Sequence, residues 1–214
     1  MPNAVFLYRR QSQTLAAVGA GKGLKPSTAC GFALTFSLLN SNPRSSSPLK
    51  RAMRFGDLPF WADELSDCIR EAICGSERET NIEDCDNEAS ILPSQLLLRD
   101  PFFDQLIANV YQPGEGICAH VDLMRFEDGI AIVSLESPCV MHFSPVQQDG
   151  EELPLAMKIP VYLNPGSLVI MWGDARYHWK HEINRRPGFQ VWRGQAIEQK
   201  QRTSITLRKL RISE

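Results

Sequence analysis

The feature that most limits how this chain can fold is the series of short apolar segments, rich in β-branched and aromatic residues, in its carboxy-terminal half. Segments of roughly four to eight residues bounded by turn residues predict strands. We expect strands at Ala108–Gln112, Gly129–Glu136, Cys139–Phe143, Met157–Leu163, Ser167–Trp172, Arg176–Ile183, Phe189–Gly194 and Thr203–Arg211. Turn signals lie at Pro145, at Asn164-Pro165-Gly166 and at Pro187-Gly188. Many short strands with such turns favour a mainly β sandwich or barrel.

Helices are expected only before these strands. Pro59–Ile73 carries apolar residues at helical spacing, with Trp61, Leu65 and Ile69 along one side, and predicts a helix packed on the sheet. Phe102–Ile107 predicts a second short helix. Between them, Glu77–Glu88 holds six acids and one Arg, which is typical of a solvated loop.

The composition is that of one globular domain with an unusual amino-terminal end. The 214 residues are 43% apolar and 22% charged, enough for one substantial core. Met1–Gly56 contains eight Lys or Arg and no acid. We expect a folded domain over residues 51–212 and a poorly ordered basic extension over residues 1–50. The same composition suits an organellar transit peptide, and a wrongly joined first exon is a further alternative.

Cysteine spacing and hydropathy limit the cellular compartments in which we expect the protein. The six cysteines, Cys30, Cys68, Cys74, Cys85, Cys118 and Cys139, form no C-x-x-C pair. This argues against a zinc knuckle and a secreted disulfide framework and favours the cytoplasm or nucleus, unless the amino-terminal segment directs the protein to an organelle. No run approaches the roughly 20 apolar residues that span a bilayer. We expect no membrane association, and a monomer, although nothing in the sequence reports the oligomeric state.

A possible metal site begins with His120 and Asp122, which stand two residues apart, and continues with His181, 59 residues further on. On a strand, residues two apart point the same way, so this pair can hold one ion. Two imidazoles and one carboxylate occupy one face of iron(II) and leave three positions open for a co-substrate and oxygen. Alone, the spacing is a weak signal.

A second signal lies in the segment from Arg202 to Arg208. On a strand, Arg202, Ser204, Thr206 and Arg208 share one face, and Ile205 and Leu207 the other. Two guanidiniums with hydroxyls between them suit a bound dicarboxylate, because Arg grips a carboxylate with two parallel hydrogen bonds. The alternative is an edge strand whose polar face is merely solvated.

A third segment leads to the metal candidates. Asn109 and Tyr111 stand two apart, and Pro113, Gly114 and Gly116 then turn the chain toward His120. The Asn amide and the Tyr hydroxyl are neutral donors suited to carboxylate or keto oxygens. The alternative is an ordinary strand with a buried Tyr.

In order, these motifs resemble the AlkB family of Fe(II)- and 2-oxoglutarate-dependent dioxygenases, most closely the branch with the tRNA wobble-uridine hydroxylase homologues and small plant relatives. The likeness runs from about Arg51 to Arg211. It implies a double-stranded β-helix, or jelly roll, with flanking helices, and Fe(II), 2-oxoglutarate and dioxygen as cofactor and co-substrates. The residues that it assigns to iron are His120, Asp122 and His181, and those that it assigns to the 2-oxoglutarate pocket are Asn109, Tyr111, Arg202, Ser204 and Arg208, with Arg202 on the distal carboxylate.

The chain departs from the family pattern at three places. Glu182 stands where relatives commonly carry Gly after the last ligand; in a strand it faces away from the metal, so we expect little harm. Met124 stands where some DNA-repair members have an acidic residue, which weakens the case for repair of alkylated bases. The family's upstream substrate-binding elements are not recognisable.

Four nearby residues invite other interpretations. His178 lies on the opposite strand face from His181, which we prefer as the ligand, and His142 reads as a packed core histidine. Cys118 shares the strand face of His120 and is either close to the metal or a small buried hydrophobe. The guanidinium of Arg176 either faces substrate or stacks on a neighbouring Trp.

The substrate is the least determined property. Residues 180–211 hold nine basic and two acidic residues, with Phe189 and Trp192 among them, which suits phosphate contacts and base stacking. We therefore expect oxidative demethylation or hydroxylation of a modified base in RNA or single-stranded DNA, RNA being favoured. A protein or small-molecule substrate is the alternative, and a non-catalytic metal-binding scaffold a third.

Overall fold

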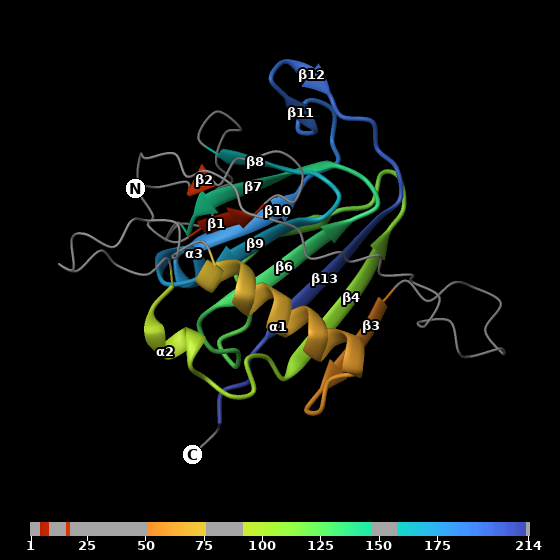
Figure 1. Ribbon diagram of the computed structural model, residues 1–214. Coiled ribbons are helices and arrows are strands. Elements are labelled where there is room, and N and C mark those ends of the chain that lie inside the picture. The colour runs from red at the N-terminus through yellow and green to blue at the C-terminus, as the bar shows by residue number, and fades with distance from the viewer. Residues whose placement is uncertain (1–4, 9–15, 18–50, 76–91, 147–157, 213–214) are drawn as a thin grey trace, which may run out of the picture.

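The computed structural model describes residues 5–8, 16–17, 51–75, 92–146 and 158–212. Two antiparallel sheets face each other, and helices lie on the outer side of the larger sheet (Figure 1). The larger sheet has the order β2 (Ala16–Ala17), β1 (Val5–Tyr8), β9 (Ser167–Met171), β6 (Ile130–Leu135), β13 (Arg202–Arg208), β4 (Gln105–Tyr111), β3 (Arg51–Phe55). The smaller has the order β5 (Ile117–His120), β10 (Trp179–Ile183), β7 (Cys139–Pro145), β8 (Ile159–Leu163). This is a jelly roll, as predicted.

Three helices and a hairpin complete the described residues. They are α1 (Phe60–Gly75), α2 (Ser94–Leu97), α3 (Asp174–Tyr177) and the hairpin of β11 (Val191–Trp192) and β12 (Gln195–Ala196), which projects from one end of the molecule (Figure 1). Among the described helices, none is long and apolar enough to cross a bilayer. Of the amino-terminal 50 residues, β1 and β2 are described, and β1 pairs with β9. The expected extension over the rest, like the acidic loop at 77–88, lies outside the described residues.

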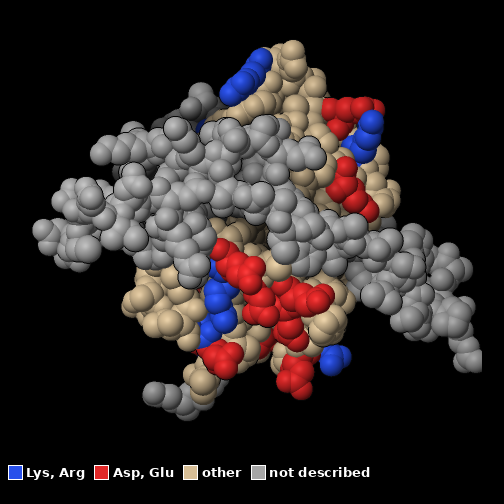
Figure 2. All heavy atoms as spheres, in the orientation of Figure 1, with Lys and Arg blue, Asp and Glu red and all other residues tan. Residues whose placement is uncertain are grey.

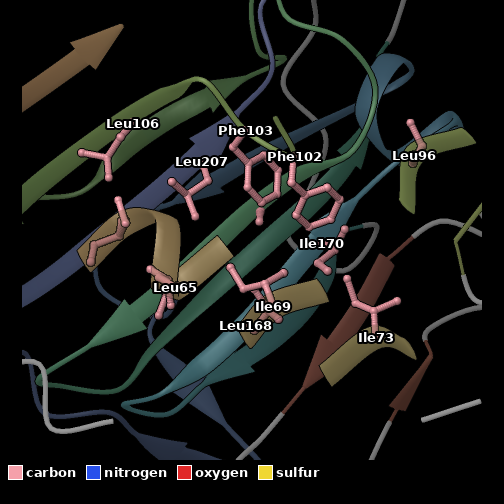
Figure 3. Close-up of a cluster of buried hydrophobic side chains, with 14 of the residues drawn as sticks. Leu65, Ile69, Ile73, Leu96, Phe102, Phe103, Leu106, Leu168, Ile170 and Leu207 are labelled. Atoms are coloured by element: carbon pink, nitrogen blue, oxygen red, sulfur yellow. The ribbon is translucent and has the colours of Figure 1, made fainter. Parts of the chain in front are cut away.

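Helix α1 forms because its apolar residues recur on one side. Leu65, Ile69 and Ile73 are buried against the outer face of the larger sheet, where they meet Leu168 and Leu207 (Figure 3). Each such side chain, fully buried, contributes roughly 1.5–3 kcal/mol of transfer free energy. The opposite side of α1 is acidic and exposed, as the red patch in Figure 2 shows. The helix therefore closes one face of the sheet and leaves the other face for the site.

A second core fills part of the space between the two sheets. Ile132 and Val169 from the larger sheet pack with Met141, Val161 and other apolar residues of the smaller sheet. This core lies toward β8 and β9, whereas the inner faces of β4 and β13 line a cavity. The jelly roll is thus packed on one side and hollow on the other, and the hollow side holds the candidate site.

Two expected elements were wrong in detail. Phe102 and Phe103 are buried, but no helix forms there, because β4 begins at Gln105 and the short helix α2 comes earlier. The strand expected at Arg176–Ile183 begins only at Trp179, since its first residues belong to α3. Tertiary packing overrode local propensity in both cases.

Candidate active site

The three metal candidates come together at the junction of β5 and β10. His120 lies directly opposite His181 in the paired strands, with ring centroids 4.3 Å apart. Asp122 follows two residues after His120, and one ligand atom from each of the three side chains lies within 4.8 Å of the others. Residues 59 positions apart in the sequence thus face one point in space, as a metal centre requires.

Hydrogen bonding orients the ring of His120. Its Nδ1 lies 2.8 Å from the carbonyl oxygen of Cys118, so Nδ1–H donates and Nε2 is left for a metal. The register shifts between His181 and Ile183, which breaks strict alternation along β5. Cys118 is consequently exposed and does not line the cavity, so the expectation that it lies beside the metal or is buried was wrong.

Asp122 is placed by a loop and not by strand alternation, because β5 ends at His120. The guanidinium of Arg176, 1% exposed, donates to the backbone carbonyls of Asp122 at 2.9 Å and Leu123 at 2.8 Å. A third bond goes to the carbonyl of Phe126 at 3.2 Å. Both readings of Arg176 from sequence were therefore wrong: it neither faces substrate nor stacks on a Trp, but fixes the loop that carries a ligand.

The electrostatics of the cluster suit a divalent cation. Burial opposes ionisation of Asp122, but the ion pair with Arg208 and the nearby histidines outweigh it, so the pKa of Asp122 is below its ordinary value. Burial lowers the pKa of His181 to about 4, although Asp122 acts in the opposite direction. At neutral pH the cluster thus offers a carboxylate and an unprotonated imidazole, the forms that bind metals. Oδ2 of Asp122 is buried and has no hydrogen-bond partner within the described residues, which fits a metal ligand.

A cavity of about 390 Å³ extends from this cluster between the sheets. Its wall on the larger sheet is built in register: Tyr111 lies opposite Arg202, and Asn109 opposite Ser204. The alternation predicted for residues 202–208 is confirmed, because Ile205 and Leu207 point to the outer core. The five side chains that the resemblance assigned to the co-substrate all line this one cavity.

Arg202 marks the end of the cavity away from the metal candidates. Its side chain is 1% exposed, its Nε donates to Oγ of Ser134 at 2.9 Å, and its guanidinium lies over the ring of Tyr111. Nη2 is buried and, among the described residues, has no hydrogen-bond partner. A buried, partly unpartnered guanidinium fits the carboxylate of a dicarboxylic acid.

Arg208 occupies the metal end of the same face. It forms the ion pair with Asp122, donates to Oε1 of Gln105 at 3.1 Å and lies over the ring of Phe126. Gln105, fully buried in the cavity wall, was missed by sequence reasoning. The sequence could have indicated it, since Gln105 stands four residues before Asn109 and therefore on the same strand face.

The remaining histidines lie elsewhere. The side chain of His178 is exposed and contacts Oδ1 of Asp174 at 3.1 Å, apart from the metal cluster. His142 is a buried core residue, as expected, in a T-shaped contact with the ring of Phe189. Glu182 faces away from the metal candidates, also as expected, and forms a buried ion pair of 2.6 Å with Lys158.

The fold and the site agree with what known proteins show. A family model described as the 2OG-Fe(II) oxygenase superfamily matches residues 57–208. The chain belongs to this superfamily. Its cofactor and co-substrates are Fe(II), 2-oxoglutarate and dioxygen, as the resemblance implied, and both the orphaned carboxylate oxygen and the orphaned guanidinium nitrogen fit them.

Relatives assign this oxygenase to the AlkB-like group. It is 38% identical over 134 residues to the tRNA (carboxymethyluridine(34)-5-O)-methyltransferase alkbh8 of Xenopus tropicalis, covering 55% of the chain and 20% of the relative. It is 33% identical over 121 residues to the alkylated DNA repair protein ALKBH8 homolog of Arabidopsis thaliana (50% and 34%). It is 44% identical over 75 residues to the mitochondrial alpha-ketoglutarate-dependent dioxygenase alkB homolog 7 of Bos taurus (35% and 31%). The chain spans a fifth to a third of the length of these relatives.

Proposed function

We propose that this dioxygenase hydroxylates a modified base of single-stranded nucleic acid, RNA in preference to DNA, with loss of the modification where the oxidised carbon is an N-methyl group. The observation that carries the proposal is that the cavity lining includes both exposed cations and exposed apolar side chains, which we call its mouth. Such a surface suits a phosphate backbone and an unstacked base together.

One side of the mouth is the edge strand β3, and the other is the loop after Asp122. Met53 and Leu123 line the cavity and are 44% and 61% exposed. Phe55, 43% exposed, stands next to this lining on the same strand face as Met53. The guanidinium of Arg125 lies 5.4 Å from the centre of the Phe55 ring, which links the two sides. Arg51 adds a second exposed cation to the lining. This cationic and apolar rim is the contact surface that we assign to the nucleic acid.

The distribution of acidic residues is also compatible with a nucleic acid bound at the rim. The acidic side of α1 lies on the outer face of the larger sheet (Figures 1 and 2), and no residue of α1 lines the cavity between the sheets, so these acids stand apart from the rim. The aromatic residues first considered for base stacking are engaged: Trp192 stacks on Tyr162 at 5.5 Å, and Phe189 packs on His142. The rim therefore replaces the segment 180–211 as the proposed contact surface.

The names of two relatives agree with a nucleic-acid substrate. The Xenopus protein is named for a tRNA uridine modification and the Arabidopsis protein for repair of alkylated DNA. A protein or small-molecule substrate is the competing possibility, and it predicts a different response to salt, because binding through phosphate contacts weakens as counterions are added.

We assign iron binding to His120, Asp122 and His181, and co-substrate binding to Asn109, Tyr111, Arg202, Ser204 and Arg208. When bound, Fe(II), 2-oxoglutarate and dioxygen supply the oxidising power that hydroxylates a C–H bond, with succinate and carbon dioxide as co-products. The chain contributes orientation and exclusion of water.

Two arginines provide the orientation, and apolar residues of the cavity lining provide the exclusion of water. Arg176 fixes the loop that bears Asp122, and Arg202 holds the distal carboxylate so that the keto acid points toward the metal. Ile132, Met141 and Ile183 line the cavity between these two points and keep water away from the reacting atoms.

The test measures succinate release with methylated RNA, methylated single-stranded DNA and methylated peptides. Wild-type protein should show faster turnover with RNA, and this stimulation should fall as salt rises. Arg125→Gln and Phe55→Ala should lose the stimulation yet keep the slow turnover without substrate. Arg54→Gln is the matched control, since Arg54 is exposed on β3 but stands on the opposite strand face from Met53 and Phe55. Stimulation by a peptide alone, or equal stimulation in all three variants, would overturn the proposal.

A further inference from the structure

Arg185 stands two residues beyond Ile183, which lines the cavity, and neither the sequence motifs nor the resemblance assigned it. Arg185 is partly buried and lies beside the cavity lining, not in it. Its Nε donates to the carbonyl oxygen of Glu115 at 3.0 Å. Its Nη1 and Nη2 are buried, and neither has a hydrogen-bond partner within the part of the chain that the structure describes. A buried guanidinium with two open donor groups is costly unless a ligand completes it.

The chain after β10 carries Arg185. His181 and Ile183 line the cavity, and Arg185 follows Ile183 by two residues, just after the end of β10. The side chain of Gln190 keeps this extension beside β7: it bonds both the N–H and the carbonyl of Val140 and also the carbonyl of Asn184, each at 2.9 Å.

A close turn supports the other side of this residue. A Cβ on Gly116 would lie 2.0 Å from the carbonyl oxygen of Ile183 and 3.2 Å from Cγ of Arg185. Glycine at this position lets the turn that leads into β5 pack directly on the extension of β10. The position of the Arg185 guanidinium is therefore built by the fold from both sides.

The charged groups around Arg185 favour binding of an anion. Strand pairing places the two guanidiniums at the same end of the fold: Arg202 lies opposite Tyr111, and Nε of Arg185 bonds the carbonyl of Glu115, four residues after Tyr111. Burial lowers the pKa of Arg185, Cys139 acts in the opposite direction, and the Arg202 guanidinium lowers it further. Cys139 lies near both, but burial raises the pKa of its thiol, which stays uncharged. No ion pair joins either guanidinium to a carboxylate of the described residues. Two guanidiniums with unpartnered buried donors thus lie at and beside the distal end of the cavity, and no carboxylate of the described residues pairs with them.

We propose that Arg185 is a second cationic contact for the distal carboxylate of 2-oxoglutarate, beside Arg202, and that the pair makes the pocket selective for a dicarboxylic keto acid over a monocarboxylic one. A carboxylate has two oxygens with room for about four hydrogen bonds, so one group can satisfy the orphaned Nη2 of Arg202 and the open side of Arg185 together. This inference concerns the co-substrate and does not depend on the nature of the oxidised substrate.

The experiment compares two keto acids that differ only at the distal end. Protein loaded with Mn(II) in place of iron is titrated calorimetrically with 2-oxoglutarate and with 2-oxopentanoate, which has the same length but no distal carboxylate. Arg185→Gln should weaken binding of 2-oxoglutarate by about 10- to 100-fold, the range of one or two charge-assisted hydrogen bonds, and leave 2-oxopentanoate nearly unchanged.

Two further variants keep the test decisive. Arg186→Gln removes the neighbouring exposed charge and should leave both affinities at the wild-type values. Arg185→Lys keeps the charge and most of the stem, so it carries the same comparison if the glutamine variant fails to fold, with an intermediate loss for 2-oxoglutarate alone. Equal weakening of both keto acids would mean that Arg185 only supports the fold, and an unchanged 2-oxoglutarate affinity would also overturn the proposal.

Discussion

Replacing Arg202 with alanine separates a 2-oxoglutarate pocket from a metal-binding barrel without one. In the wild-type cavity the guanidinium is 1% exposed, and one of its nitrogens has no hydrogen-bond partner in the described residues, so a bound carboxylate gains both charge and donors there. Arg202→Ala leaves that carboxylate buried with its principal cation removed. The loss should be about 3–5 kcal/mol, or more than a hundredfold in affinity for 2-oxoglutarate.

The assay is calorimetric titration of Mn(II)-loaded protein with 2-oxoglutarate, beside a titration of the metal alone. Metal affinity should stay within about twofold of wild type, since Arg202 contacts Ser134 and Tyr111 and none of the metal candidates. Arg202→Lys should restore part of the co-substrate affinity, because one ammonium cannot reproduce a two-pronged contact. Unchanged 2-oxoglutarate affinity in Arg202→Ala would refute the assignment of this pocket.

Three more predictions follow from the same geometry. His181→Ala should abolish binding of Mn(II) in direct titration, whereas His178→Ala should retain it, and equal losses would refute the choice of ligand. Because burial lowers the pKa of His181 from 6.5 to about 4, the unfolded state binds the extra proton first. Metal-free protein should therefore lose up to about 3 kcal/mol of stability as pH falls from 6.5 to 4 in denaturant titrations, and a pH-independent stability there would contradict this. Gly116→Ala should lower the thermal midpoint more than Gly114→Ala, because the added Cβ meets a backbone carbonyl in the first case and only an unfavourable positive φ in the second. A larger loss at Gly114 would refute that comparison.

The outer frame of the fold could be predicted from local pattern. Alternating residues such as Ile205 and Leu207 must place one strand face in a core, and the helical spacing of Leu65 and Ile69 must place one helix side there, whatever the rest of the chain does. Both followed from the sequence because the period of a helix or strand is a local property. The false helix at residues 102–107 shows the limit, since burial of Phe102 and Phe103 came from packing and not from a helical turn.

The residues of the site could likewise be predicted in part from the sequence. The spacing of His120, Asp122 and His181 named the metal candidates, and alternation along β13 named Arg202 and Arg208. The strand period holds for Arg202 and Arg208 but not for Asp122, which a loop places, and the resemblance ordered all of these residues into one pocket.

Tertiary structure alone decided how these side chains are held. Arg176 reaches three carbonyls more than 45 positions earlier in the chain, and no local pattern encodes such contacts. The position of Arg185 depends on Gln190, which bonds Val140 of β7 and Asn184 after β10, and on the space left by Gly116. Loop closure and strand register bring these groups together, and both are properties of the whole chain, whereas a sequence pattern reports only the period of its own segment.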